Sequence, residues 1–179
     1  MPASMLDNPT ITSLLGLLVE RPLHLYALSQ ELPRRLDASG LSVGRGSVRN
    51  LLVRLSDIGW VELGGPDAAD DVATYRITKK GLAELRNRVR SQVQDTSPDH
   101  DHFVQAVAYI GLFGTQEACL ILRRRRERLT TRLTDVTREH ARALDSGQPW
   151  THLAEVDYAL SQTAAAIAWL DRTIDRLQR

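Results

Sequence analysis

A regular hydrophobic pattern lies between residues 47 and 58. Apolar residues recur there at spacings of three and four: Val48, Leu51, Leu52, Leu55 and Ile58. Because an α-helix turns once every 3.6 residues, this spacing places them on one side of a helix. Ser47 is a candidate N-cap, and Gly59 accepts the left-handed conformation that ends many helices. The pattern therefore predicts a short amphipathic helix.

Two further helices are predicted before this one. Apolar residues at positions 11, 14, 15, 17 and 18 indicate a helix that ends near Pro22, since proline disfavours helical geometry in the preceding residue. Leucines at 25, 28, 32 and 36 indicate a second helix, bent or terminated around Pro33. Three short helices with tight connections are typical of a helix-turn-helix unit.

Residues 60–63 and 72–77 favour strands, and the loop between them is rich in glycine and aspartate. Two strands directly after the third helix predict a winged helix-turn-helix, with Thr78 as the candidate cap of a fourth helix. Because Asp67, Asp70 and Asp71 would be repelled by phosphate, we expect the loop to stay off a nucleic-acid backbone or to fold over its own helix.

The second half of the chain is predicted to be helical. A segment around Ser97-Pro98 separates the halves, so we predict a winged helix-turn-helix domain over 1–96 and a helical domain over 97–179. A long helix, with Thr115 as its candidate cap, is expected to reach about Leu144. A break at 145–149 then precedes a final helix of about 28 residues.

The final helix carries apolar residues at alternating spacings of three and four, the heptad pattern of a coiled coil. The predicted dimer-interface residues are Leu153, Val156, Leu160, Ile167, Leu170, Ile174 and Leu177. The preceding helix can cover part of this stripe as an antiparallel partner. Because a pair alone leaves an apolar face bare, a second copy of the chain is the simplest cover. The predicted fold class is mainly α, with a coiled-coil-like dimer of C-terminal helices.

Composition narrows the classes of function. The chain has 179 residues and a net charge of +1, so nucleic-acid binding must come from local charge placement. Cys119 is the single cysteine, which excludes an intrachain disulfide and a multi-cysteine zinc site. We find no signal-peptide pattern, no apolar run that spans a bilayer and no catalytic motif. We expect a cytoplasmic protein that is not an enzyme and holds no cofactor or metal.

The polar residues near the third helix are the candidate DNA contacts. Guanidinium groups and an amide suit phosphates and base edges. The candidates on or beside this helix are Arg45, Ser47, Arg49, Asn50 and Arg54. His24 and Tyr26 open the second helix, where related folds contact phosphate. For each residue the alternative is an ordinary role as a solvated side chain, a helix cap or a packing residue.

Four segments carry a family resemblance in their order and spacing. They are Leu14–Tyr26, Gly46-Ser47-Val48 with Leu51–Leu55 and Gly59-Trp60-Val61-Glu62, Tyr75–Gly81, and Phe103-Val104-Gln105-Ala106 through Arg123–Arg126. Together these segments resemble the PadR family of transcriptional regulators over nearly the whole chain. The resemblance implies a homodimeric, cytoplasmic DNA-binding protein, usually a repressor that leaves its operator when a small effector binds. Leu25 replaces the family's usual glycine, and Arg49 and Asn50 replace a tyrosine and a proline, so a different operator sequence is expected.

Two alternatives remain from the sequence. Trp150 and Trp169 are candidates for lining a pocket for a small hydrophobic effector between subunits, although packing is the simpler role. The rival to a DNA-binding protein is a protein-interaction module in which the C-terminal coiled coil binds a partner helix. DNA binding should weaken steeply as salt rises, whereas a packed protein interface should respond far less.

Overall fold

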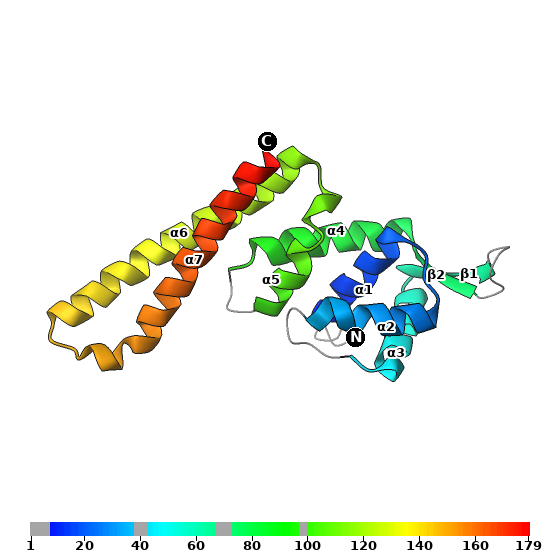
Figure 1. Cartoon of the computed structure of the whole chain (residues 1–179), viewed down its shortest axis with the longest axis horizontal. Helices are drawn as coiled ribbons and strands as arrows, with labels where there is room; N and C mark the ends of the chain where they lie inside the picture. The colour runs from blue at the N-terminus through cyan, green and yellow to red at the C-terminus, as the bar shows by residue number, and fades with distance from the viewer. Residues whose placement is uncertain (1–7, 38–42, 67–72, 97–99) are drawn as a thin grey trace. The chain divides into compact units, whose positions relative to one another are not determined.

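The computed structural model describes residues 8–37, 43–66, 73–96 and 100–179. The chain forms two compact units, 1–93 with 97–112 and 94–96 with 113–179. These units are defined by packing, so the expected division into functional domains at residue 96 stays a prediction. The predicted mainly α fold class is confirmed (Figure 1).

The first unit has the element order of a winged helix-turn-helix. Its helices and strands are α1 (Pro9–Glu20), α2 (Leu25–Leu36), α3 (Arg45–Asp57), β1 (Val61–Pro66), β2 (Ala73–Ile77), α4 (Lys79–Gln94) and α5 (His100–Val107), followed by a 3₁₀ turn at Ile110–Leu112. The three helices, the two-stranded wing and the fourth helix that the sequence predicts are confirmed. α2 does not end at Pro33 but continues to Leu36, which is fully buried and anchors the last turn.

α1 is the centre of this unit. All its residues from Thr10 to Leu18 are buried, as expected for a helix that is surrounded by others. Its start is capped by Asn8, whose Oδ1 accepts a hydrogen bond from the Thr10 amide at 2.9 Å. The apolar stripes of α2 and α3 complete the core with Leu28, Leu32, Leu36, Val48, Leu52 and Leu55.

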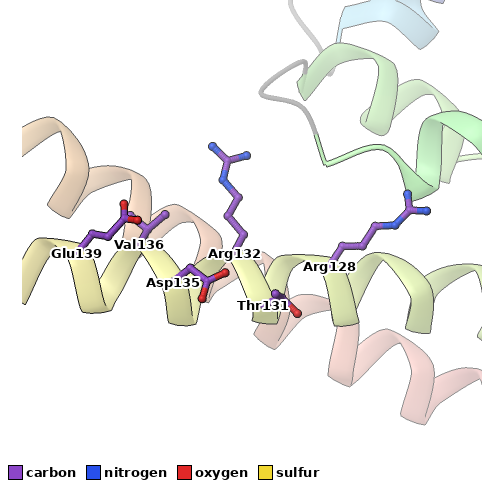
Figure 2. A pocket seen from close by; sticks show the side chains of 6 residues that line it. All are labelled: Arg128, Thr131, Arg132, Asp135, Val136 and Glu139. Atoms are coloured by element: carbon purple, nitrogen blue, oxygen red, sulfur yellow. The ribbon is translucent and has the colours of Figure 1, made fainter.

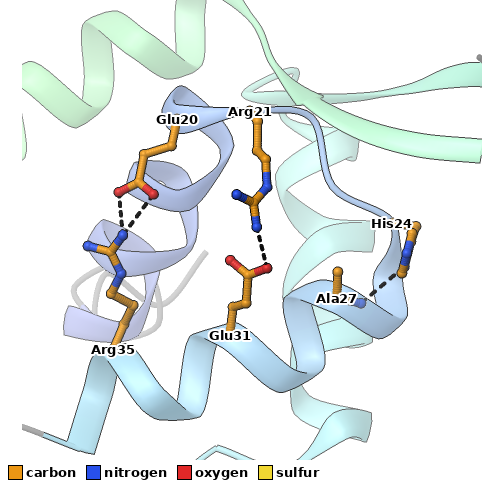
Figure 3. Close-up of polar contacts among 6 residues, drawn as sticks. All are labelled: Glu20, Arg21, His24, Ala27, Glu31 and Arg35. Carbon is orange, nitrogen blue, oxygen red and sulfur yellow. Dashed lines mark hydrogen bonds and ion pairs between the residues drawn. The ribbon is translucent and has the colours of Figure 1, made fainter.

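Two ion pairs join the end of α1 to α2 (Figure 3). Arg35 donates to both carboxylate oxygens of Glu20 at 2.5 and 2.7 Å, and Arg21 donates to Glu31 at 2.6 Å. Exposed pairs contribute little individually, about 0–1 kcal/mol each. Because Arg21 follows directly after α1 and Arg35 lies on α2, the two pairs together favour a single register between α1 and α2.

The wing is a twisted antiparallel pair of strands. Val61 lies opposite Ile77, Glu62 opposite Arg76 and Leu63 opposite Tyr75, with an irregularity between Leu63 and Pro66. Leu23, just before α2, adds an isolated bridge to Tyr75 with hydrogen bonds of 3.2 and 2.8 Å. The sequence did not predict this bridge, which ties the start of α2 to the wing. The predicted acidic loop with Asp67, Asp70 and Asp71 lies outside the described residues.

The end of α3 is fixed by the start of α4. Gly59 has a φ of +76°, which confirms the predicted left-handed end of the helix. The Thr78 hydroxyl donates to the Gly59 carbonyl at 2.7 Å and accepts from the Gly81 amide at 3.0 Å, so the predicted cap of α4 is confirmed. A Cβ added at Gly81 would lie 2.0 Å from the Trp60 carbonyl oxygen. Only glycine lets α4 approach the backbone just before β1 this closely.

Two other predicted caps are wrong. Gly44 precedes α3 and Gly114 precedes α6, and neither position provides a side-chain capping hydrogen bond. Ser47 and Thr115 instead lie within the first turns of these helices. Both helices begin where the backbone leaves the extended conformation, and at each the residue just before the first turn is a glycine.

α5 packs against α1 in the first unit. Tyr109, just after α5, places its ring over Gly16, where an added Cβ would lie 2.0 Å from the Tyr109 Cζ. The Tyr109 hydroxyl donates to the Ser13 carbonyl at 3.2 Å, and the Ser13 hydroxyl bonds to the buried Gln105 side chain. The buried side chains of Tyr109, Ser13 and Gln105 therefore each have a hydrogen-bond partner, which avoids the cost of leaving them unsatisfied.

The second unit is a hairpin of two long helices. α6 (Thr115–Asp145) and α7 (Ala154–Leu177) run antiparallel and are joined through a turn with Gly147 at φ +88° and a 3₁₀ segment at Trp150–His152. The antiparallel helix pair that the sequence predicts is confirmed. The expected final helix of about 28 residues is shorter, at 24, because the chain forms the 3₁₀ segment first.

Three arginines on α6 bind the segment that follows α4. Arg125, Arg128 and Arg132 donate to the carbonyl oxygens of Asp95, Gln94 and Thr96, the latter two at 3.0 and 3.2 Å. Burial lowers the pKa of the Arg125 guanidinium, while Asp95 opposes this shift. Arg126 points elsewhere and pairs with Asp171 of α7. The run of four arginines therefore does not form one basic face.

We predict that Gly81→Ala destabilises the protein by about 1–3 kcal/mol, because the new methyl group would overlap the Trp60 carbonyl oxygen. Gly46→Ala is the matched control, since nothing lies within 4 Å of a Cβ added there. Within a helix this control change should leave stability unchanged or raise it by up to about 1 kcal/mol. Urea unfolding measures both, and equal midpoints for the two variants would contradict the close approach of α4 to β1.

Stability should also fall at high pH through Tyr109. Burial raises the pKa of this phenol to about 12, while Arg35 acts to lower this pKa and Glu20 to raise it. Because the unfolded phenol titrates near pH 10, the unfolded state loses its proton first. The contribution of protonated Tyr109 to the free energy of unfolding is therefore complete below about pH 10. It is lost as the pH rises toward 12, by at most about 3 kcal/mol. Urea unfolding at pH 9 and 11.5 should show a smaller fall in the free energy of unfolding for Tyr109→Phe than for the control Tyr158→Phe, whose residue is exposed.

Candidate nucleic-acid interface

α3 has one buried side and one exposed side. Val48, Leu52 and Leu55 are at most 1% exposed and face the core. Opposite them, at about 100° of rotation per residue, one row of exposed residues runs along the helix: Gly46, Asn50, Val53 and Asp57. We call this row the outer row. It is the part of α3 that a partner molecule would meet first.

Arginines lie on both sides of the outer row. Arg49 is on one side, Arg54 and Ser47 are on the other, and all three are exposed. Arg45 begins α3, but its side chain lies outside the described part of the structure. The first turn contains no acidic residue, and Asp57 is the one carboxylate of the helix, at its last position. The positive charge of α3 is therefore concentrated toward its first three turns.

The two candidates at the start of α2 differ in their surroundings. His24 is the N-cap of α2, and its Nδ1 accepts a hydrogen bond from the Ala27 amide at 3.0 Å (Figure 3). In the neutral ring the proton is then on Nε2, which leaves a donor on the other side of the ring. Tyr26 is 60% exposed, with its ring centroid 6.3 Å from that of His24. Capping by His24 is thus established, and contact of either residue with DNA stays a prediction.

The outer row contains two residues, Gly46 and Val53, that are not among the predicted DNA contacts. Val53 is 50% exposed although it is apolar, and Gly46 leaves open space at the first turn. The signal was present in the sequence, since both residues fall on the same helical side as Asn50. Charge and polarity mark candidate DNA contacts in a sequence, and neither property marks valine or glycine.

The predicted dimer stripe lies largely on the side of α7 that packs against α6. Leu153, Leu170 and Ile174 are buried within the chain, and Val156, Leu160, Ile167 and Leu177 are half-buried. The opposite side of α7 is also partly aromatic, with Tyr158 at 66% and Trp169 at 36% exposed. A contact between two copies through the half-buried residues stays a prediction, and this opposite side is the more open surface.

The structure does not bring the two effector candidates together within one chain. Trp150 lies in the 3₁₀ segment and Trp169 lies 15 residues beyond the start of α7, which corresponds to about 22 Å along a helix. α6 carries a hollow of about 460 Å³ lined by Arg128, Thr131, Arg132, Asp135, Val136 and Glu139 (Figure 2). Neither tryptophan lines this hollow.

Comparisons with known proteins give structural matches only. No protein-family model matches the sequence, and the search of curated proteins found no match.

In the described parts of the chain, none of the helices has the length and apolar character to cross a membrane.

Several solved structures are similar to this chain. One is PadR from Bacillus subtilis in complex with operator DNA, with 18% identity, coverage of 93% of this chain and 98% of that chain, and a TM-score of 0.40. The same protein in complex with p-coumaric acid has 17% identity, coverage of 97% of this chain and 97% of that chain, and a TM-score of 0.42. A PadR-like transcriptional regulator from Bacillus cereus has 15% identity, coverage of 94% of this chain and 98% of that chain, and a TM-score of 0.40.

Proposed function

We propose that the chain is a sequence-specific, DNA-binding transcriptional regulator of the PadR type that inserts α3 into the major groove. The observation that carries this proposal is the exposed side of α3, where Arg49 and Arg54 flank Asn50. A helix of this kind fits the major groove, where an amide can pair with adenine and guanidinium groups can bind phosphates. The fixed junction of α3, the wing and α4 supports the helix in one position.

A homodimer would give such a helix its specificity. Two copies joined through their α6–α7 hairpins would present two α3 helices to half-sites about 34 Å apart, one helical turn of DNA. A partly palindromic operator is the expected target. An effector that favoured a different arrangement of the two copies would release the DNA by a population shift. Repression, with release by a small hydrophobic effector, is the form of regulation that the family resemblance favours.

A protein-interaction module is the second candidate function. Exposed Tyr158 and Trp169 on α7 favour it, since aromatic residues are enriched in protein interfaces, and so does the net charge of +1. In this case α7 would bind a partner helix, and α3 would have no DNA to read. The salt dependence of binding separates the two functions.

We predict that Arg49→Ala weakens binding to a DNA site selected from a random duplex library. If Arg49 contacts a phosphate, affinity should fall at every sequence, and the slope of log K against log salt should decrease by about 1. Arg142→Ala, an exposed arginine in the last turn of α6, is the matched control. Fluorescence anisotropy at several salt concentrations measures both variants. Unchanged affinity and slope for Arg49→Ala would contradict the role of α3.

The dimer surface can be tested with two charge substitutions on α7. Leu160→Lys affects the predicted stripe but also removes a half-buried residue that faces α6. Tyr158→Arg changes the open side, where a 66% exposed residue contributes little to folding of one chain. We expect sedimentation to show a dimer for the unaltered protein and monomers for Leu160→Lys. Dissociation by Tyr158→Arg would assign the interface to the open side, and a monomer that binds its operator with full affinity would contradict dimeric recognition.

A further inference from the structure

We propose that Val53 is a specificity-determining residue that contacts the C5-methyl group of a thymine in the major groove. This inference rests on the proposed function and names part of the base sequence that α3 would read. It concerns a residue whose apolar side chain carries no charge signal.

The position of Val53 carries the inference. It lies in the outer row of α3, three residues after Asn50, so the two side chains point to neighbouring parts of the same surface. Arg49 and Arg54 lie on either side of this pair. In a helix that enters the groove, the outer row meets the base edges, while the flanking positions reach the phosphates.

Folding does not explain a valine at this position. The core side of α3 is filled by Val48, Leu52 and Leu55, and Val53 lies on the other side at 50% exposure. Valine is also a weaker helix former than alanine, lysine or glutamate, because its branched side chain loses rotamer freedom in a helix. The helix would therefore be slightly more stable with any of these residues. An apolar contact made only in a complex explains why a small apolar side chain is present.

Thymine supplies the matching chemistry. Its C5-methyl group is the apolar group that the four bases present in the major groove, so contact with it distinguishes A·T from the other pairs. The Asn50 amide can form two hydrogen bonds with the N6 and N7 atoms of adenine. Three residues of helix rise about 4.5 Å, close to one base-pair step of 3.4 Å. We therefore expect each half-site to contain two A·T pairs at adjacent or nearly adjacent steps, one read by Asn50 and one by Val53.

The neighbours of this pair along the outer row fit the same arrangement. Gly46, one turn before Asn50, has open space around it and allows the backbone to approach a base edge. Asp57, one turn after Val53, carries a negative charge that phosphate would repel. The first turns of α3 therefore lie deepest in the groove, and Val53 is at the limit of the part that reads bases.

The test begins with selection of a binding site from a random duplex library by the full-length protein. Each thymine of the site is then replaced in turn by deoxyuridine, which lacks only the methyl group. For the unaltered protein we expect one thymine in each half-site whose replacement weakens binding about threefold to tenfold. Val53→Ala should bind the thymine and uracil forms of this position equally, which a double-mutant cycle measures. Leu144→Ala, an exposed apolar truncation on α6, should retain the preference for thymine.

The outcomes separate this inference from the function on which it rests. Failure to select any site would contradict the proposed DNA-binding function itself. A selected site at which every methyl group is neutral would overturn the role of Val53 alone, and so would a Val53→Ala variant that still prefers thymine. Thermal melting is the control for folding, because Val53→Ala, an exposed substitution, should leave the melting temperature unchanged or slightly higher.

Discussion

The arrangement of the first unit depends on one close backbone approach, between Gly81 at the start of α4 and the carbonyl of Trp60. Thr78 adds a hydroxyl that donates to Gly59 and caps α4, and Lys80 donates to the carbonyl of Ile58 at 2.8 Å. The end of α3, the first strand of the wing and the start of α4 are thereby held at one point. Two of the sequence segments that resemble the PadR family contain these residues, so the motifs describe a packing requirement.

The exposed side of α3 follows from this support. Val48, Leu52 and Leu55 are used in the core and the end of the helix is fixed, so folding requires no further contact on the other side. A net charge of +1 gives the whole chain little attraction for DNA, whereas arginines around Asn50 and Val53 give one helix a local positive surface. Binding through such a surface would draw its affinity from phosphates and its specificity from a few base contacts.

Apolar spacing was sufficient to predict α1, α3 and the long helices, and strand-favouring residues predicted the wing. Gly59 and Thr78 were predictable from local backbone chemistry. Ser47 and Thr115 were wrong as caps, since local sequence does not decide which of several residues begins a helix. The packing of Tyr109 on Gly16 and the inward side of the α7 stripe depend on contacts between distant segments. Val53 was missed because an apolar side chain on an exposed helix face carries no charge signal.

Ultraviolet crosslinking of the protein to a selected DNA duplex, followed by mass-spectrometric mapping of the crosslinked peptides, tests the central claim most directly. If α3 reads DNA, crosslinks should fall within residues 45–57, on the exposed side of α3, and few should fall within 115–145. Crosslinks confined to the α6–α7 hairpin, or none to α3 at a saturated site, would contradict the claim that α3 is the element that reads DNA.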